Sequence, residues 1–466
     1  MERGLQMEET RQNKQEENKM GVMPINRLLL DMSLPIMISM IVQALYNIVD
    51  SVFVAKISEN ALTAVSLAFP IQNLMIAIAV GTGVGVNALL SKSLGEKNFE
   101  RVNKTAENAV FLAMMSYLVL LFIGLFGIGV FYRSQTADEQ IIHYGIQYGM
   151  ICCCLSIGVF LQVTMERILQ ATGKTFYTMI TQGTGAIINI ILDPVLIFGL
   201  FGFPRMEVAG AAAATVAGQI VAAILATFLN HKVNHEVKIS WKGFRPDKKI
   251  IAKIYQVGVP SIIMQSIASV MTYGMNRILM GFTATATAVF GVYFKLQSFI
   301  FMPVFGLNNG MIPIIAYNYG ANSKKRVVQT IRYSTIYAVA IMAVGTLVFH
   351  LFTADLLRMF NASETMLQIG IPALRIISVS FAIAGYCIVC SSVYQALGNG
   401  MYSLTVSVAR QLIVLLPVAY LLSKLGNVNL VWWSFPIAEL ASLVMSTVFL
   451  VKIYRQIICK LGEGAA

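Results

Sequence analysis

The stretch SLPIMISMIVQALYNIVDSVFVA, residues Ser33–Ala55, has the length and composition of a membrane-spanning helix. About 20 apolar residues are needed to cross the hydrocarbon core of a bilayer. Within it, Gln43, Asn47 and Asp50 are spaced i, i+4 and i+7, so they share one helical face. A carboxylate inside a span is costly unless it faces a protein interior or a water-filled cavity. We therefore predict a functional role for Asp50; the alternative is that it lies near enough to the helix end to be solvated.

The composition extends this interpretation to the whole chain. Of the 466 residues, 57% are hydrophobic and only 12% are charged, whereas a soluble domain carries about 25% charged residues. Five of the six cysteines lie inside apolar runs, so we interpret them as packing residues and expect no metal site. The sequence predicts an all-α polytopic membrane protein with twelve spans, near residues 33–56, 61–90, 106–131, 141–169, 176–200, 208–230, 252–280, 285–317, 331–353, 367–396, 403–423 and 430–453.

Lys and Arg are concentrated in alternate loops, and this bias predicts the orientation of the chain. They gather in the N-terminal segment, in the long central linker and after the last span, which favours two cytoplasmic termini. The net charge of +12 is therefore a topology signal, and we expect no nucleic-acid partner. The expected organisation is a cytoplasmic tail (1–27), an N-terminal lobe (28–230), a cytoplasmic linker (231–253), a C-terminal lobe (254–455) and a cytoplasmic tail (456–466).

The two halves of the chain are a sequence repeat. A single offset of 225 aligns Pro35 with Pro260, Phe69 with Phe294, Gln72 with Gln297, Gly81 with Gly306, Gly85 with Gly310, Gly95 with Gly320, and Gln170-Ala171 with Gln395-Ala396. Because each half holds six spans, both halves cross the membrane in the same sense. The repeats are then parallel and related by an axis along the membrane normal, with a central cleft between them. This architecture is more typical of transporters than of channels or membrane enzymes.

A second intramembrane acid lies in the span near 176–200. Gln182, Asn189 and Asp193 share one face of this helix, and Asp193 precedes Pro194. Proline removes a backbone hydrogen bond and frees a carbonyl nearby, so the group predicts a site for a proton or a small cation. The alternative is that Asp193-Pro194 only marks a helix end. Thr215 in the next span is a weaker candidate ligand, for which hydrogen bonding to a neighbouring helix is the favoured role.

The second half does not repeat these acids, because the offset puts Met275 and Val418 in their places. It carries Lys295, Arg410 and Glu439 instead, either as an internal ion-pair network or as separate groups reaching an interface. Met and Phe side chains suit a promiscuous site for flat lipophilic cations. The candidates for lining the substrate cleft are Gln43, Asn47, Gln182, Met264, Phe294, Lys295, Arg410 and Glu439.

The chain resembles the multidrug and toxic compound extrusion (MATE) transporters. The resemblance rests on two six-span halves, Leu34-Pro35 and Val49-Asp50 in the first span, Asn189 through Asp193-Pro194, and the Gln-Ala-x-Gly turns at 170–173 and 395–398. The segments 291–297 and 436–439 look most similar to the MepA-like branch of Gram-positive bacteria.

The resemblance implies a bacterial plasma-membrane antiporter that works by alternating access. Inward flow of H⁺ or Na⁺ would drive efflux of organic cations, with Asp50, Asn189, Asp193 and Thr215 as the coupling site. We expect no cofactor beyond the coupling ion, a monomer surrounded by membrane lipids, and small-molecule drugs as substrates. Two alternatives are a lipid or lipid-linked oligosaccharide flippase of related architecture, which needs a basic cavity, and a membrane enzyme, for which no nucleophile–base constellation is evident.

Overall fold

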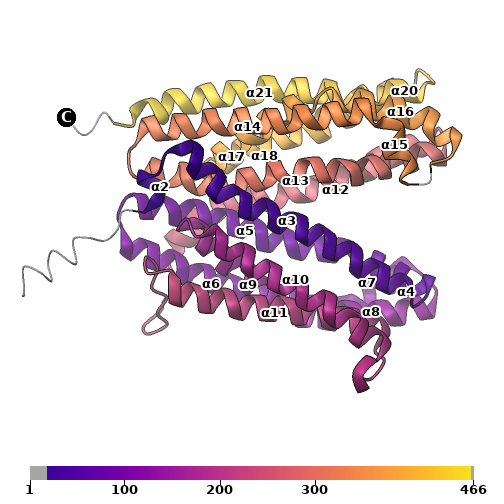
Figure 1. Ribbon diagram of the computed structural model, residues 1–466, viewed down its shortest axis with the longest axis horizontal. Helices are drawn as coiled ribbons and strands as arrows, with labels where there is room; N and C mark the ends of the chain where they lie inside the picture. The colour runs from indigo at the N-terminus through magenta and orange to yellow at the C-terminus, as the bar shows by residue number, and fades with distance from the viewer. Residues whose placement is uncertain (1–17, 361, 463–466) are drawn as a thin grey trace, which may run out of the picture.

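The structure is a computed structural model, and it describes residues 18–360 and 362–462. In these residues, ten helices are long and apolar enough to cross a membrane, and two further pairs of helices, bent by 42° and 48°, bring the number to twelve if each pair is one span. The prediction of an all-α fold with twelve spans is confirmed. The helices run along the long axis of the molecule as two bundles (Figure 1).

The first bundle, here the N-lobe, contains the helices up to the central linker. They are α3 (Ile25–Ala55), α4 (Glu59–Leu67), α5 (Phe69–Gly95), α6 (Phe99–Phe122), η1 (Ile123–Gly127), α7 (Ile128–Gln135), α8 (Glu139–Cys154), α9 (Ile157–Ala171), α10 (Thr175–Phe198), η2 (Leu200–Gly202) and α11 (Glu207–Val233). A short helix, α2 (Lys19–Val22), precedes them.

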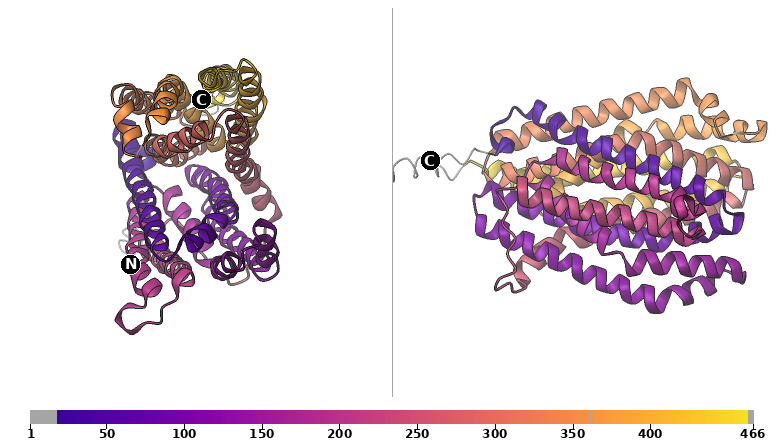
Figure 2. Two further views of the ribbon diagram at one scale, coloured as in Figure 1. Left: turned by 90° about the vertical axis from the view of Figure 1, so that its right-hand side faces the viewer. Right: turned by 60° about the horizontal axis from the view of Figure 1, so that its bottom comes forward.

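The second bundle, the C-lobe, follows the linker. Its helices are α12 (Lys248–Met280), α13 (Ala284–Gly320), α14 (Lys324–Leu351), α15 (Thr353–Arg358), α16 (Glu364–Ser378), α17 (Phe381–Ala396), α18 (Gly400–Val408), η3 (Ala409–Leu415), α19 (Leu416–Ser423), α20 (Val428–Val431), α21 (Ser434–Gln456) and η4 (Ile458–Lys460). The end-on view separates the two bundles (Figure 2, left).

The linker without helix is shorter than the predicted 231–253, because the flanking helices continue beyond the apolar runs. α11 ends at Val233 and α12 begins at Lys248. Asp247 fixes this start: its side chain accepts hydrogen bonds from the backbone N–H groups of Lys249 and Ile250, as an N-cap residue does.

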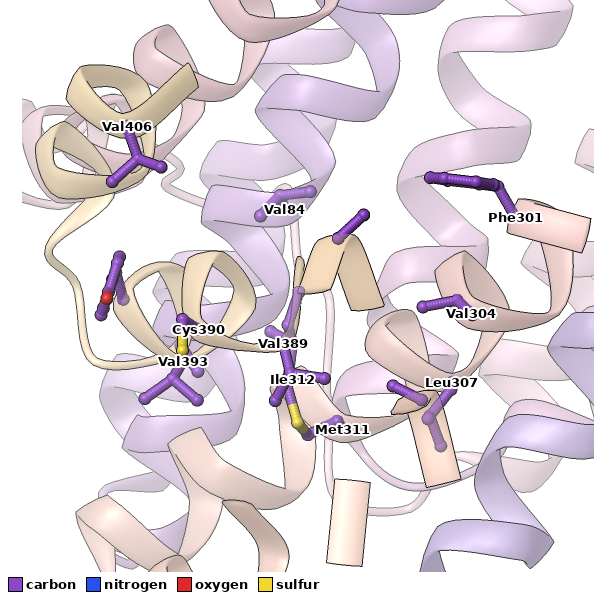
Figure 3. Close-up of a cluster of buried hydrophobic side chains, with 14 of the residues drawn as sticks. Val84, Phe301, Val304, Leu307, Met311, Ile312, Val389, Cys390, Val393 and Val406 are labelled. Atoms are coloured by element: carbon purple, nitrogen blue, oxygen red, sulfur yellow. The ribbon is translucent and has the colours of Figure 1, made fainter. Parts of the chain in front are cut away.

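The lobes meet through glycine faces that the repeat relates to one another. Gly81 of α5 lies against Ile262 of α12, and its counterpart Gly306 of α13 lies against Met37 of α3, which is also 225 residues from Ile262. A methyl group at Gly95 would overlap the carbonyl oxygen of Tyr317, so only glycine permits this approach. The glycines of the second span therefore serve helix packing. Figure 3 shows Val84 of α5 among core side chains of α13, α17 and α18.

We call the end of the molecule that holds Asn18, the linker and Gly462 the terminal end, and the opposite end the distal end (Figure 1). At the terminal end, residues 18–23 form a strap that contacts both lobes. These residues belong to the predicted tail 1–27, of which residues 1–17 lie outside the described part of the chain. Asn18 Nδ2 donates to the carbonyl of Thr172 (3.0 Å) in the N-lobe. Arg326 of the C-lobe donates to the carbonyls of Met20 (2.9 Å) and Met23 (2.8 Å).

Direct polar contacts between the lobes all lie towards the terminal end in the described residues. Ser33 Oγ donates to the carbonyl of Leu307 (3.3 Å), and Arg167 Nη1 donates to Asn309 Oδ1 (3.0 Å). Lys92 Nζ lies 4.4 Å from the ring centroid of Tyr319. No such contact between lobes is found near the distal end of the described chain, so the lobes are fastened at one end only.

Candidate functional site

The N-lobe holds a cavity of about 80 Å³ that is walled by α3, α9, α10 and α11. Its polar lining includes Gln43, Glu166, Gln182, Asn189 and Thr215. Four of these residues were predicted from the sequence, two as substrate-cleft candidates and two as coupling residues. The structure brings them together around an acid, Glu166, that the sequence analysis did not single out.

Glu166 is buried and is held entirely by neutral donors. Its Oε1 accepts from Gln162 Nε2 (3.0 Å) and Thr181 Oγ1 (2.8 Å), and its Oε2 accepts from Gln182 Nε2 (2.7 Å). The adjacent Arg167 turns away, towards Gln170 and the C-lobe residue Asn309. None of the ion pairs within 18–360 and 362–462 involves Glu166. The cavity therefore contains a carboxylate that no basic side chain neutralises directly.

The predicted coupling residues form a cluster that shares Asn189 and Thr215 with this cavity and extends from it towards the distal end. Asn189 Nδ2 donates to Thr215 Oγ1 (3.2 Å) and, at 3.5 Å, to Asp193 Oδ1. Asp193 is fully buried. α3 packs along α10, so the helix that carries Asp50 lies beside the helix that carries Asn189 and Asp193. Three of the four predicted coupling residues are thus in hydrogen-bond contact, and the fourth is on the neighbouring helix.

Every buried side-chain atom without a partner among the acids and amides of this cavity and cluster is an oxygen acceptor. Asp50 Oδ1, Asn189 Oδ1, Asp193 Oδ2 and Gln182 Oε1 are buried and accept no hydrogen bond from the described residues. A buried acceptor without a donor costs about 1–3 kcal/mol. Donors or cations would satisfy all four oxygens, whereas further acceptors would not. The arrangement therefore suits a proton, a metal cation or a protonated amine.

Small residues let α10 and α11 approach closely enough to form this cluster. A methyl group at Gly185 would lie 3.1 Å from the carbonyl oxygen of Gly218, and one at Gly210 would lie 2.6 Å from that of Leu196. α10 also continues through Pro194 to Phe198. Asp193 therefore lies inside the helix, and the alternative that Asp193-Pro194 marks a helix end is wrong.

The C-lobe holds a larger cavity of about 540 Å³, here the C-lobe chamber. Met264, Phe294, Arg410 and Glu439 line it, although they were predicted for a central cleft between the lobes. Arg410 Nη1 donates to Glu439 Oε1 at 2.6 Å, which is the ion pair anticipated for the C-terminal half. Lys295 takes no part in it: this exposed side chain lies with Nζ 5.9 Å from the ring centroid of Phe360.

Asn47 and Arg167 lie outside the two cavities. Asn47 is exposed on α3 and lines neither cavity. Arg167 is buried inside α9 and bridges the lobes. The spacing i, i+4 of Gln162 and Glu166 in an apolar run was a signal for the missed acid, because the same rule had pointed to Asp50.

Comparisons with known proteins agree over nearly the whole chain. A family model described as MatE matches residues 35–195 and 260–421, one match in each repeat. The multidrug export protein MepA of Staphylococcus haemolyticus is 26% identical over 416 residues, covering 89% of this chain and 91% of that protein. A protein of Shewanella oneidensis named FAD transporter is 27% identical, covering 90% and 92%. A solved structure of a MATE family transporter in an outward-facing conformation superposes with a TM-score of 0.88 at 23% identity, covering 96% of this chain and 99% of that one.

Proposed function

We propose that this chain, which belongs to the MatE family of membrane transporters, exports lipophilic organic cations in exchange for H⁺ or Na⁺ by alternating access. The family and the similarity to multidrug export proteins support the broad class of activity. The names of the relatives differ in cargo, since one is an FAD transporter. The proposed substrate class and the ion coupling therefore rest on the charges of the N-lobe.

The observation that carries the proposal is the set of unneutralised carboxylates in the N-lobe. Glu166 faces a cavity, and Asp50 and Asp193 lie beyond it, with Arg167 directed at the other lobe. A cavity of about 80 Å³ is smaller than the 300–1,000 Å³ typical of drug-sized sites. We infer that only the cationic headgroup of a substrate enters it, beside Glu166. The pyrophosphate of a lipid-linked flippase substrate would be repelled by these acids, which disfavours the flippase alternative.

Coupling between ion and drug follows from the unpartnered oxygens of Asp50, Asn189 and Asp193, which are distinct from the Glu166 carboxylate. An ion bound there would bring positive charge into the same lobe as the substrate cation. Two cations close together in a medium of low dielectric repel, so binding of one weakens binding of the other. Such a coupling is reciprocal: the ion lowers the affinity for the drug by the same factor as the drug lowers the affinity for the ion.

Contact between the lobes at the terminal end alone is what one state of an alternating-access cycle would show. We infer that the terminal end faces the cytoplasm, because Lys and Arg are concentrated there, and that the structure is outward-facing. Ion binding at the N-lobe would then release substrate to the outside, and return to the inward-facing state would require the strap and the glycine contacts at the terminal end to open.

Drug efflux from proteoliposomes with ΔpH and ΔNa⁺ imposed separately tests this function. One of the two gradients, imposed alone, should accelerate efflux of ethidium, and collapse of that gradient by an ionophore should abolish the acceleration. Efflux that is indifferent to both gradients would contradict antiport. Asp50→Asn with full gradient-driven efflux would contradict the assignment of the coupling site.

A further inference from the structure

The C-lobe chamber is a second cavity with a chemistry unlike that of the N-lobe cavity. Its volume of about 540 Å³ falls within the range of drug-sized ligand sites. Apart from Val84 of α5, its walls come from helices of the C-lobe. Its charged groups are one cation and one anion, Arg410 and Glu439, whereas the N-lobe cavity has the uncompensated Glu166.

The walls of the chamber are suited to flat rings. Phe294, Phe301 and Phe435 line it, and Tyr293 stands edge-on to both Phe294 and Phe435, with interplanar angles of 71° and 65°. Aromatic side chains bind other aromatic rings by offset stacking and by edge-to-face contact. A planar aromatic body therefore fits this lining better than a flexible aliphatic one.

The ion pair leaves binding capacity unused on both partners. The bond to Glu439 uses one of the five N–H groups of the Arg410 guanidinium, and no other acceptor in the described residues bonds to it. The Arg410 side chain is 30% exposed and that of Glu439 is 10% exposed. Glu439 Oε2 is buried and has no donor.

Neutral polar groups that line the chamber are also unpartnered. They include Ser442 Oγ next to the ion pair, and both side-chain atoms of Asn308, which are buried without a partner. Buried polar atoms are normally hydrogen-bonded, so a group of unpaired donors and acceptors that lines one cavity points to a ligand with both functions.

Charge balance decides the ligand class. A cation alone would be repelled by Arg410, and an anion alone would leave the chamber with a net negative charge. A ligand that carries both charges can place its anion on Arg410 and its cation beside Glu439, so that each charge keeps a partner. We propose that the C-lobe chamber is a second ligand site, and that it binds flat aromatic zwitterions through Arg410 and Glu439.

This ligand site goes beyond the proposed function. It rests on that function only in the assumption that the bound ligand is a transported substrate. The site itself is testable by binding to the full chain in lipid nanodiscs, with no ion gradient. A suitable probe pair is rhodamine B, a zwitterion at neutral pH, and rhodamine B ethyl ester, which has the same rings but lacks the carboxylate. Binding of each dye is followed by fluorescence anisotropy at fixed ionic strength.

The double variant Arg410→Gln/Glu439→Gln removes both charges together and leaves no unpaired buried ion. We expect its affinity for rhodamine B to fall at least tenfold and its affinity for the ester to change less than twofold. Arg277→Gln is the matched control, because it removes a positive charge from α12 outside the chamber, and it should bind both dyes like the wild type. Arg410→Lys, which keeps the charge but loses the planar fork, should weaken rhodamine B binding about threefold to tenfold.

Unchanged rhodamine B binding in the double variant, or an equal loss of both dyes, would overturn the proposal. If the double variant does not fold, Arg410→Lys with undiminished rhodamine B affinity overturns it in the same way. A chain that binds rhodamine B through Arg410 but shows no ion-driven efflux would contradict the antiport function while supporting this site, so the two failures are distinguishable.

Discussion

Replacing Glu166 by Gln should weaken binding of organic cations and leave the fold intact. The amide keeps the shape of the side chain and can still accept from Thr181 and from Gln162. What it loses is the charge. A cation about 5 Å from the carboxylate, at an effective dielectric constant of about 20, is attracted by roughly 3 kcal/mol. The amide dipole retains part of this attraction, which leaves a loss of about 1.5–2 kcal/mol, or roughly 10- to 30-fold in Kd.

The assay is equilibrium binding of tetraphenylphosphonium to the full chain in nanodiscs, at constant pH and salt. Glu59→Gln is the matched control: it removes the same charge from an exposed position in the first turn of α4 and should bind like the wild type. A Kd of Glu166→Gln within twofold of the wild type would show that the cavity does not use this carboxylate to bind cations.

Three further substitutions test other parts of the account. Asp193→Asn should lower gradient-driven ethidium efflux at least tenfold, while its affinity for tetraphenylphosphonium stays within about threefold of the wild type. A tenfold loss of that affinity, with efflux still driven by the ion gradient, would contradict the assignment of ion and drug to different acids. Arg326→Ala removes the hydrogen bonds to Met20 and Met23 and should open the terminal end, measured as a population shift in spin-label distances across that end. Unchanged distances would show that the strap does not fasten the lobes. Gly95→Ala should lower the unfolding temperature, because overpacking a close contact costs about 1–3 kcal/mol, whereas Gly183→Ala, which meets nothing within 4 Å, should not.

The fold was predictable because its main determinants are local. Apolar length gave the spans, and the repeat of Gly81 and Gly306 indicated two equivalent halves, whose glycines do pack on equivalent partners. Helix ends were less predictable, since α11 and α12 continue into polar sequence that hydrogen-bonding caps can still stabilise.

The site was predictable only in part, since its distant contacts depend on tertiary packing. The helical spacing of Gln182, Asn189 and Asp193 identified the face that lines the N-lobe site. Spacing did not identify Glu166 as the acid that this face surrounds, because the pairing of α9 with α10 is a matter of tertiary structure. For the same reason the contact of Arg167 with the other lobe could not be predicted from spacing.

The most direct test of the central claim is a reversed exchange in proteoliposomes. An imposed ethidium gradient, with no initial ion gradient, should drive H⁺ or Na⁺ in the opposite direction, followed by a lumenal pH dye and by ²²Na⁺. Antiport predicts ion movement that depends on ethidium in the wild type and is lost in Asp193→Asn. Ethidium movement in the wild type without counterflow of either ion would contradict it.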